Sequence, residues 1–136
     1  MSAGAYLLAA VLVGLGSGLG AVARWGLREL ITRAAVARTA ANGDRVRPWT
    51  TFGANLIACF LIGLVVAQFG SATGTGEFVY LLLAVGFCGG LSTLSTAAFD
   101  IVELVRHTTF SLALAYLMLS AGGGMAALWL GIVIAS

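Results

Sequence analysis

The stretch GFCGGLSTLSTAAFD, residues 86–100, decides how this chain folds. It lies in the third of four long apolar segments, and it places the adjacent Gly89 and Gly90 directly before a run of hydroxyl side chains. The hydroxyl residues are Ser92, Thr93, Ser95 and Thr96. A continuous helix across hydrocarbon gains nothing from such a cluster, and unpaired backbone groups must be buried in protein or line a wet cavity. The stretch therefore predicts a membrane helix that is broken near its centre, as at many ion and solute sites.

The same residues also have a plainer interpretation. Small residues let membrane helices approach one another closely, and Ser and Thr often bond back to their own helix. Taken alone, the stretch favours this packing face over a break, so the two interpretations have to be separated by the rest of the chain.

Composition places the chain in a membrane. The 136 residues are 60% hydrophobic and 9% charged, with a mean hydropathy of +1.05. Soluble domains are about half apolar and a quarter charged. We expect one all-α membrane domain, residues 1–136, with no room for a soluble catalytic domain and no nucleic-acid partner. No basic region precedes the first apolar segment, so we expect it to be a retained helix and not a signal peptide.

Four apolar segments predict four transmembrane helices, because a span needs about 20 residues. We place them at about residues 6–30, 49–69, 77–105 and 110–134, with the third interrupted at the glycine pair and a loop at 29–48. The first segment carries glycines at alternating positions, which predict a thin face for close packing. They are Gly14, Gly16, Gly18 and Gly20. Arg24 follows near the membrane edge, where we expect a structural anchor.

The basic residues are distributed on one side only. All seven are arginines, and four spans place every one of them on the side of the 1–2 and 3–4 connections. They are Arg24, Arg28, Arg33, Arg38, Arg45, Arg47 and Arg106. By the positive-inside rule that side is cytoplasmic, so both termini are predicted outside and the chain is predicted to insert in one orientation.

Neutral polar residues form the candidate lining of a path. They are Asn55, Ser92, Thr93, Ser95, Thr96, Tyr116 and Ser120. All of these side chains can donate hydrogen bonds, and no carboxylate lies in the middle of a span. A proton-coupled exporter or a cation channel would need such a carboxylate. Donors without fixed negative charge suit a small anion, which must replace its water shell on entry.

Other motifs carry no chemistry. Cys59 and Cys88 lie inside apolar segments and are interpreted as packing residues. His107 is interpreted as a solvated residue at a helix connection. The glycine-rich run of the first helix has no preceding strand, so a dinucleotide-binding motif is rejected. We find no catalytic constellation, and an enzyme is not expected.

Four motifs in the same order resemble the small bacterial fluoride channels of the Fluc (CrcB) family. GLGSGLGAVARWGLR (14–28) resembles the glycine-rich first helix, and TTFGANLIACFLIG (50–63) resembles the second helix with its pore asparagine, here Asn55. GFCGGLSTLST (86–96) resembles the broken third helix, and Asp100 falls where the family has an acidic residue. Tyr116 and Ser120 match the polar track of the fourth helix. The resemblance covers nearly the whole chain.

This resemblance implies passive, selective export of fluoride by an antiparallel dimer with two pores at the interface. It also implies a structural sodium ion at the dimer centre, held by backbone carbonyls that match Gly89 and Ser92. Two family phenylalanines are replaced by Leu94 and Ala97, and the third hydroxyl of the fourth-helix track is replaced by Gly124. Because an antiparallel homodimer needs a balanced arginine distribution, the strong bias here leads to the hypothesis of a heterodimer. The second subunit would be a similar chain, inserted in the opposite orientation, that carries the phenylalanines.

Two other functions compete with this hypothesis. Small four-helix multidrug transporters rely on a membrane-embedded glutamate in their first helix, and none precedes Glu29 in this chain. A purely structural partner would support the pore of another subunit and contribute no lining of its own.

Overall fold

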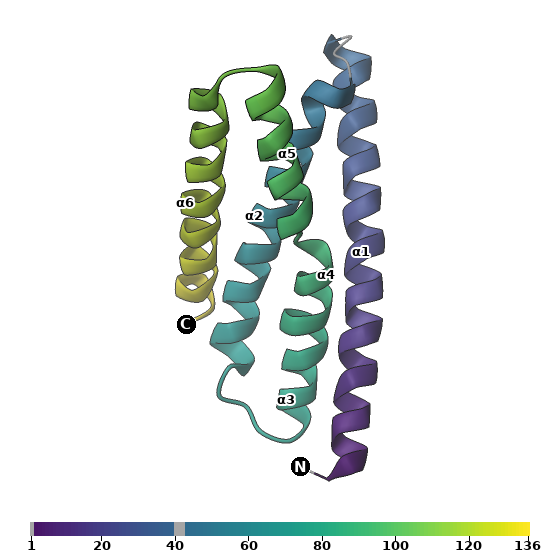
Figure 1. The fold of residues 1–136 in the computed structure, drawn as a ribbon. Helices are drawn as coiled ribbons and strands as arrows, with labels where there is room; N and C mark the ends of the chain where they lie inside the picture. Colours follow the sequence, from purple (N-terminus) through teal and green to yellow (C-terminus); the bar gives the residue numbers. More distant parts are fainter. Residues whose placement is uncertain (1, 40–42) are drawn as a thin grey trace.

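The computed structural model describes residues 2–39 and 43–136, and the side chains of residues 39–45, Arg45 included, lie outside the described part. The described residues form helices joined by short turns, with no strand among them. The helices pack as antiparallel rods, with both termini toward the same end (Figure 1). They are α1 (Ala3–Thr39), α2 (Gly43–Phe69), a third rod made of α3 (Thr75–Tyr80), η1 (Leu81–Cys88), α4 (Gly89–Leu91) and α5 (Leu94–His107), and α6 (Phe110–Ala135).

Each rod contains a stretch long and apolar enough to cross a membrane. These stretches are Ala3–Arg38, Val46–Phe69, Thr75–His107 and Phe110–Ala135. The prediction of an all-α membrane protein with four spans and an interrupted third helix is confirmed. The predicted loop at 29–48 is wrong, because α1 continues to Thr39 and α2 begins at Gly43. Alanine and arginine are the most frequent residues of that segment and favour helix, and Glu29 pairs with Arg33 one turn later at 2.6 Å.

The first rod lies against the third through glycines. A methyl group on Gly20 would overlap the carbonyl oxygen of Phe87, and a methyl group on Gly90 would overlap that of Ser17. Gly63 on α2 and Gly131 on α6 make the same kind of contact, since each faces backbone of the other helix. Small residues therefore bring two pairs of rods into backbone contact, as is usual between membrane helices. Gly14 and Gly18 have no neighbouring atom within 4 Å, so their side of α1 is open.

The third rod is irregular in two places. Its middle part, η1, is a π-helix, a wider coil that often marks functional sites. The chain leaves the helix only after Leu91, where Ser92 and Thr93 have extended backbone. The break was expected at Gly89 and Gly90, and this position is wrong, because both residues are helical. The glycine pair serves packing at Gly90, while the hydroxyl residues directly after it carry the break.

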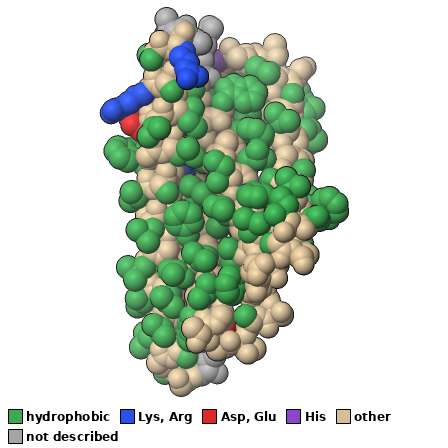
Figure 2. Space-filling model, turned by 180° about the vertical axis from the view of Figure 1, so that it is seen from behind, with side chains coloured by type: hydrophobic (Ala, Val, Ile, Leu, Met, Phe, Trp, Pro, Cys, Tyr) green, Lys and Arg blue, Asp and Glu red, His purple; other side chains and the backbone are tan. Residues whose placement is uncertain are grey.

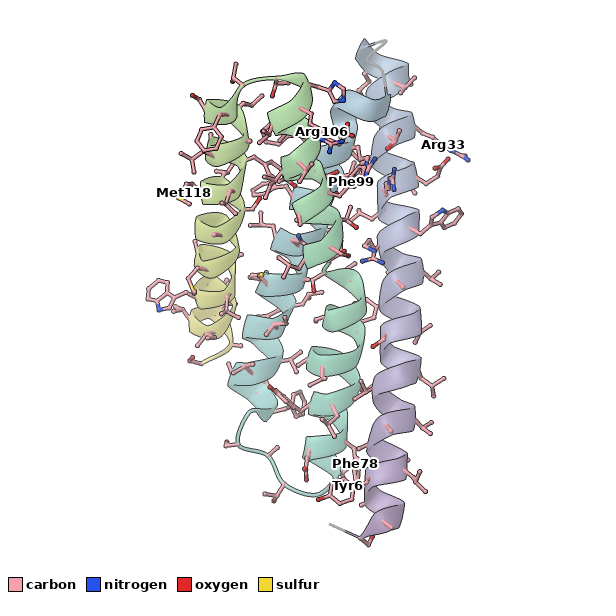
Figure 3. The ribbon with its side chains drawn as sticks, viewed as in Figure 1. Tyr6, Arg33, Phe78, Phe99, Arg106 and Met118 are labelled. Carbon is pink, nitrogen blue, oxygen red and sulfur yellow. The ribbon has the colours of Figure 1, made fainter. Side chains whose placement is uncertain are left out.

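Hydrophobic side chains cover most of the surface. Figure 2 shows them along nearly the whole length of one face, with arginine side chains at one end. Arg33 and Arg106 lie toward that end, and Tyr6 and Phe78 lie toward the other (Figure 3). Such a surface suits a bilayer, with the arginines at one interface.

Candidate functional site

The break in the third rod is held open by side chains. Ser92 has φ −76° and ψ 155°, and Thr93 has φ −152° and ψ 111°, so both residues are extended between two helices. Thr93 is also the N-cap of α5, because its hydroxyl oxygen accepts a hydrogen bond from the Thr96 amide at 3.2 Å. Threonine is a common N-cap residue, since its side chain satisfies an amide that the first turn leaves free. The sequence therefore starts a new helix at the position where the previous one ends.

Asn55 of α2 bridges this break. Its Nδ2 donates to the Thr93 carbonyl oxygen at 3.3 Å, and its Oδ1 accepts from the Thr93 amide at 2.7 Å. One amide side chain thus replaces the helical acceptor of the Thr93 amide and adds a second donor to the Thr93 carbonyl, which also accepts from the Ala97 amide at 3.4 Å. An unpaired backbone group in this environment would be costly. The bridge explains why an asparagine lies inside an apolar segment.

The break frees backbone carbonyl groups, among them those of Gly89 and Ser92. In a continuous helix the Gly89 oxygen would accept from the Thr93 amide, and the Ser92 oxygen from the Thr96 amide. Those amides donate to Asn55 and to the Thr93 hydroxyl instead. The Gly89 oxygen accepts only from the Ser92 hydroxyl, at 3.5 Å, among the hydrogen bonds of the described residues. The Ser92 oxygen accepts from Nη1 of Arg24 at 3.3 Å, so the expected anchor on α1 reaches the break itself.

The hydroxyl groups of the break form a small network. The Thr93 hydroxyl donates to the Thr96 hydroxyl at 3.0 Å and lies 3.2 Å from the Ser95 hydroxyl. Ser95 is exposed on the surface of this single chain, and Leu94 beside it is 85% exposed. The break therefore places neutral hydrogen-bond donors on an outer face of the chain. Whatever covers this face meets these donors.

The two predicted residues of α6 lie in a different place. Tyr116 is buried, and its hydroxyl donates to the Pro48 carbonyl oxygen of α2 at 3.0 Å. The Ser120 hydroxyl is buried one turn further along α6, with no hydrogen-bond partner among the described residues. No hydrogen bond in the described part of the chain joins these residues to Asn55 or to the break. The predicted lining therefore divides into a break group and an α6 group.

A cavity of about 750 Å³ adjoins the α6 group. It lies among the start of α2, the second half of α5 and the first half of α6, and its lining includes Arg47, Asp100 and Tyr116. Asp100 lies in α5, the last element of the third rod, and is 1% exposed. Its Oδ1 lies 3.3 Å from Nε of Arg47. Sequence reasoning missed this pair, and the only available signal was an arginine directly before Pro48 at the start of an apolar segment.

The two positions at which the resembled family has phenylalanines, Leu94 and Ala97 in this chain, differ in their exposure. Leu94 points out of the chain, and Ala97 is 7% exposed on α5. The ring of the nearby Phe99 lies under the Arg47 guanidinium, whose carbon is 4.5 Å from the ring centroid. A single chain therefore presents no aromatic ring at the two positions.

Together, these features define a class of protein. Four apolar rods, a third span opened halfway, and neutral hydrogen-bond donors at the opening are typical of small membrane proteins that conduct ions or small solutes. The described residues contain no group of three or more His, Cys, Asp or Glu side chains that could hold a metal ion.

The comparisons then identify the family. The family model described as CrcB-like protein, Camphor Resistance (CrcB), matches residues 11–132, so the chain belongs to the CrcB family. It is 33% identical to fluoride-specific ion channel FluC 1 of Mycolicibacterium paratuberculosis, over 82% of this chain and 85% of that protein. It is 32% identical to fluoride-specific ion channel FluC of Gloeothece citriformis, over 93% and 95% of the two chains. The FluC protein of Novosphingobium aromaticivorans is 34% identical, over 94% and 96%. The chain is a multi-pass membrane protein of this family and not an enzyme.

Proposed function

We propose that this chain is a subunit of a fluoride channel that lets fluoride leave the cytoplasm passively. The proposal rests mainly on one observation, a break lined by neutral hydrogen-bond donors in a chain of the CrcB family. Its relatives are named fluoride-specific ion channels. Fluoride is small and tightly hydrated, so its water must be replaced by donors as it enters the membrane. Hydroxyl and amide groups supply such donors without a fixed charge that would trap the ion.

Asn55 and the hydroxyl residues of the break have separate roles in this proposal. Asn55 uses one Nδ2 hydrogen and its oxygen to hold Thr93, which leaves the second Nδ2 hydrogen to face the ion. Ser92, Thr93, Ser95 and Thr96 line one part of the path, and Tyr116 and Ser120 line another. Ser120 supports this assignment, because its buried hydroxyl has no partner among the described residues and buried polar groups are normally satisfied.

A second, similar subunit inserted in the opposite orientation completes the channel in our proposal. Polar backbone and hydroxyl groups cannot face lipid, yet the break opens on an outer face beside the exposed Leu94 and Ser95. The second subunit covers that face and supplies the aromatic rings missing at Leu94 and Ala97. The arginine bias favours a different chain as partner, because a chain that inserts in one orientation cannot also supply the inverted copy.

The arginine-rich end faces the cytoplasm in this proposal, and both termini face outside. Arg33, Arg38 and Arg106 lie at the ends of helices on that side. Their positive field also concentrates anions at the cytoplasmic mouth. Cysteine labelling from one side of intact cells tests the orientation: Ser136→Cys is expected to react with an impermeant reagent, and Arg106→Cys is expected to react only after lysis.

A sodium ion between the two subunits fits the freed carbonyl oxygens of Gly89 and Ser92. Hard cations prefer oxygen ligands, and a carbonyl oxygen that accepts one hydrogen bond keeps a second lone pair. The ion would join the two breaks and keep their backbone open. We expect the assembled complex to unfold at a lower temperature when sodium is replaced by N-methylglucamine, and an unchanged unfolding temperature would contradict the sodium site.

The function is tested with purified protein in liposomes. The tagged chain is purified from its native membranes with any partner that remains bound, and fluoride efflux is followed with an electrode. We expect efflux from the complex that is insensitive to a proton gradient, and none from the chain alone. Fluoride efflux from the chain alone would overturn the heterodimer, and no efflux from the intact complex would overturn the channel. Proton-dependent uptake of cationic drugs would instead indicate a multidrug transporter.

The Asn55→Ala complex separates a lining role from a supporting one. Fluoride efflux is expected to fall by at least about tenfold, since the variant removes both the bridge and an ion-facing donor. Gln68→Ala is the matched control, because it removes an amide from an exposed position of the same helix. Equal efflux from the Asn55→Ala complex and the wild type would indicate a purely structural partner.

A further inference from the structure

The cavity beside α6 contains a buried carboxylate that the proposed conduction path does not explain. Asp100 is 1% exposed, and its Oδ2 has no hydrogen-bond partner among the described residues. A buried charge without a partner is very unfavourable, and a carboxylate in the wall of an anion path would also repel the ion. Tyr116 lines the same cavity, so Asp100 lies where the path would reach the arginine-rich end.

Arg47 compensates this carboxylate. Its Nε lies 3.3 Å from the Asp100 Oδ1, within ion-pair distance but without the alignment of a hydrogen bond. The Arg47 side chain is 31% exposed, against 2% for that of Asp100. The arginine therefore connects a buried anion with the open part of the cavity, and it is the only described cation within ion-pair distance of Asp100.

The position of Arg47 is fixed from two sides. On α5, its guanidinium lies over the Phe99 ring at 4.5 Å, next to Asp100 in sequence. On α2, the hydroxyls of Thr50 and Thr51 donate to the Arg47 carbonyl oxygen at 2.8 and 3.3 Å, and both residues are buried. A stacked and ion-paired arginine at a helix start holds its charge in one place, in contrast to the exposed Arg33.

A second charged pair lies at the rim of the same cavity. Nε2 of His107 lies 3.6 Å from a carboxylate oxygen of Glu103, and both side chains are largely exposed, at 71% and 46%. Water screens this pair, whereas the Arg47 and Asp100 pair is screened much less. The buried pair therefore dominates the local field inside the cavity.

We propose that Arg47 determines anion permeability at the arginine-rich end by cancelling the charge of Asp100 in the wall of the path. This inference rests on the proposed channel function. The neutral pair presents no net repulsion to a fluoride ion that moves between the cavity and the Tyr116 and Ser120 hydroxyls. Without the arginine, the carboxylate stands alone in a poorly screened site and raises the barrier for any anion.

A charge cycle in the assembled complex tests the inference by fluoride efflux from liposomes. Arg47→Gln is expected to slow efflux by at least about tenfold, because the carboxylate is left uncompensated. Asp100→Asn and the double variant Arg47→Gln with Asp100→Asn are expected to conduct within about threefold of the wild type, because no buried negative charge remains. Arg47→Lys is the matched control that keeps the positive charge, and it is expected to conduct better than Arg47→Gln.

Three outcomes decide between the inference and its alternatives. Efflux from Arg47→Gln at the wild-type rate overturns it. A double variant that is as slow as Arg47→Gln also overturns it, because the arginine would then attract anions by itself. A wild-type complex that passes no fluoride overturns the proposed function, and this inference with it, independently of the variants.

A folding defect is recognised separately. Elution volume and unfolding temperature in detergent are measured for each complex. If the pair were purely structural, adding Asp100→Asn to Arg47→Gln would not restore efflux without also changing the unfolding temperature. Should Arg47→Gln fail to assemble, Arg47→Glu combined with Asp100→Asn supplies a single carboxylate at the same cavity. That variant is expected to conduct at least about tenfold more slowly than the neutral double variant, and equal rates would overturn the inference.

Discussion

Two neighbouring parts of the third rod meet the membrane in opposite ways. From Leu81 to Leu91 the chain stays helical, and it lies against α1 through glycines with backbone touching backbone. At Ser92 and Thr93 it leaves the helix, and its backbone groups are satisfied by side chains from α2 and from its own next turn. The first part is stable because nothing polar is exposed, and the second because side chains replace the helical partners of the Thr93 and Thr96 amides.

The difference shows under which conditions a membrane-spanning segment can contain non-helical backbone. Gly86 and Gly90 do not break the helix, although glycine has the most conformational freedom, because their lack of a side chain is used for close approach to α1. The break occurs at two hydroxyl residues, where an asparagine and a threonine side chain replace the lost helical bonds. Variants that disturb one of these two parts and leave the other intact therefore test this difference.

The largest effect is expected at the glycine contact. In Gly20→Ala, the added methyl group overlaps the Phe87 carbonyl and lies 2.8 Å from the Leu91 amide nitrogen, which forces α1 away from the third rod. The free energy of unfolding in detergent is expected to fall by about 2–3 kcal/mol. Gly18→Ala is the control, because no atom lies within 4 Å of its new methyl group. Equal losses in both variants would show that helix propensity and not contact is being measured.

The next effect is expected at the bridge across the break. Asn55→Ala leaves the Thr93 amide without its acceptor and removes one of the two donors to the Thr93 carbonyl, at a cost of about 1–2 kcal/mol in the free energy of unfolding. Gln68→Ala, on the exposed end of the same helix, is expected to cost less than about 0.5 kcal/mol. An Asn55→Ala chain as stable as the wild type would mean that the break does not depend on side-chain partners.

A smaller effect is expected at the start of α5. Thr93→Val keeps the shape of the side chain but removes the acceptor for the Thr96 amide, so the loss should be about 1 kcal/mol. Thr93→Ser keeps the hydroxyl and should retain most of the stability. The two variants are compared by chemical unfolding in the same detergent, and a serine variant as unstable as the valine variant would assign the effect to packing.

The smallest effect is expected where a hydrogen bond accompanies the glycine contact. The Ser17 hydroxyl donates to the Gly86 carbonyl oxygen at 3.3 Å, and Ser17→Ala should cost only about 0.5 kcal/mol. Ser111→Ala, on the exposed start of α6, gives the baseline for removing a serine hydroxyl. A loss near that of Gly20→Ala would show that polar bonding, and not close packing, holds α1 to the third rod.

Sequence reasoning predicted the four spans because twenty or more consecutive apolar residues have only one stable environment. It placed the helix break within a few residues, and it chose Asn55 and the hydroxyl cluster as its surroundings. It put the opening at Gly89 and Gly90, because glycine is a frequent breaker and the packing of Gly90 on Ser17 depends on a helix 73 residues earlier in the chain. It also predicted a loop at residues 29–48. Charged residues occur both in loops and in helices that extend into water, so charge alone does not distinguish the two.

The order of the amino acids alone therefore predicts the environment, the number of spans, the side on which the arginines lie and the family. The folded chain was needed to show which groups meet: Asn55 with Thr93, Arg24 with the Ser92 carbonyl, and Arg47 with Asp100. The physical reason is that hydrophobic burial depends on composition over long windows. Hydrogen bonds and ion pairs depend on distances of a few tenths of an ångström between residues far apart in the chain.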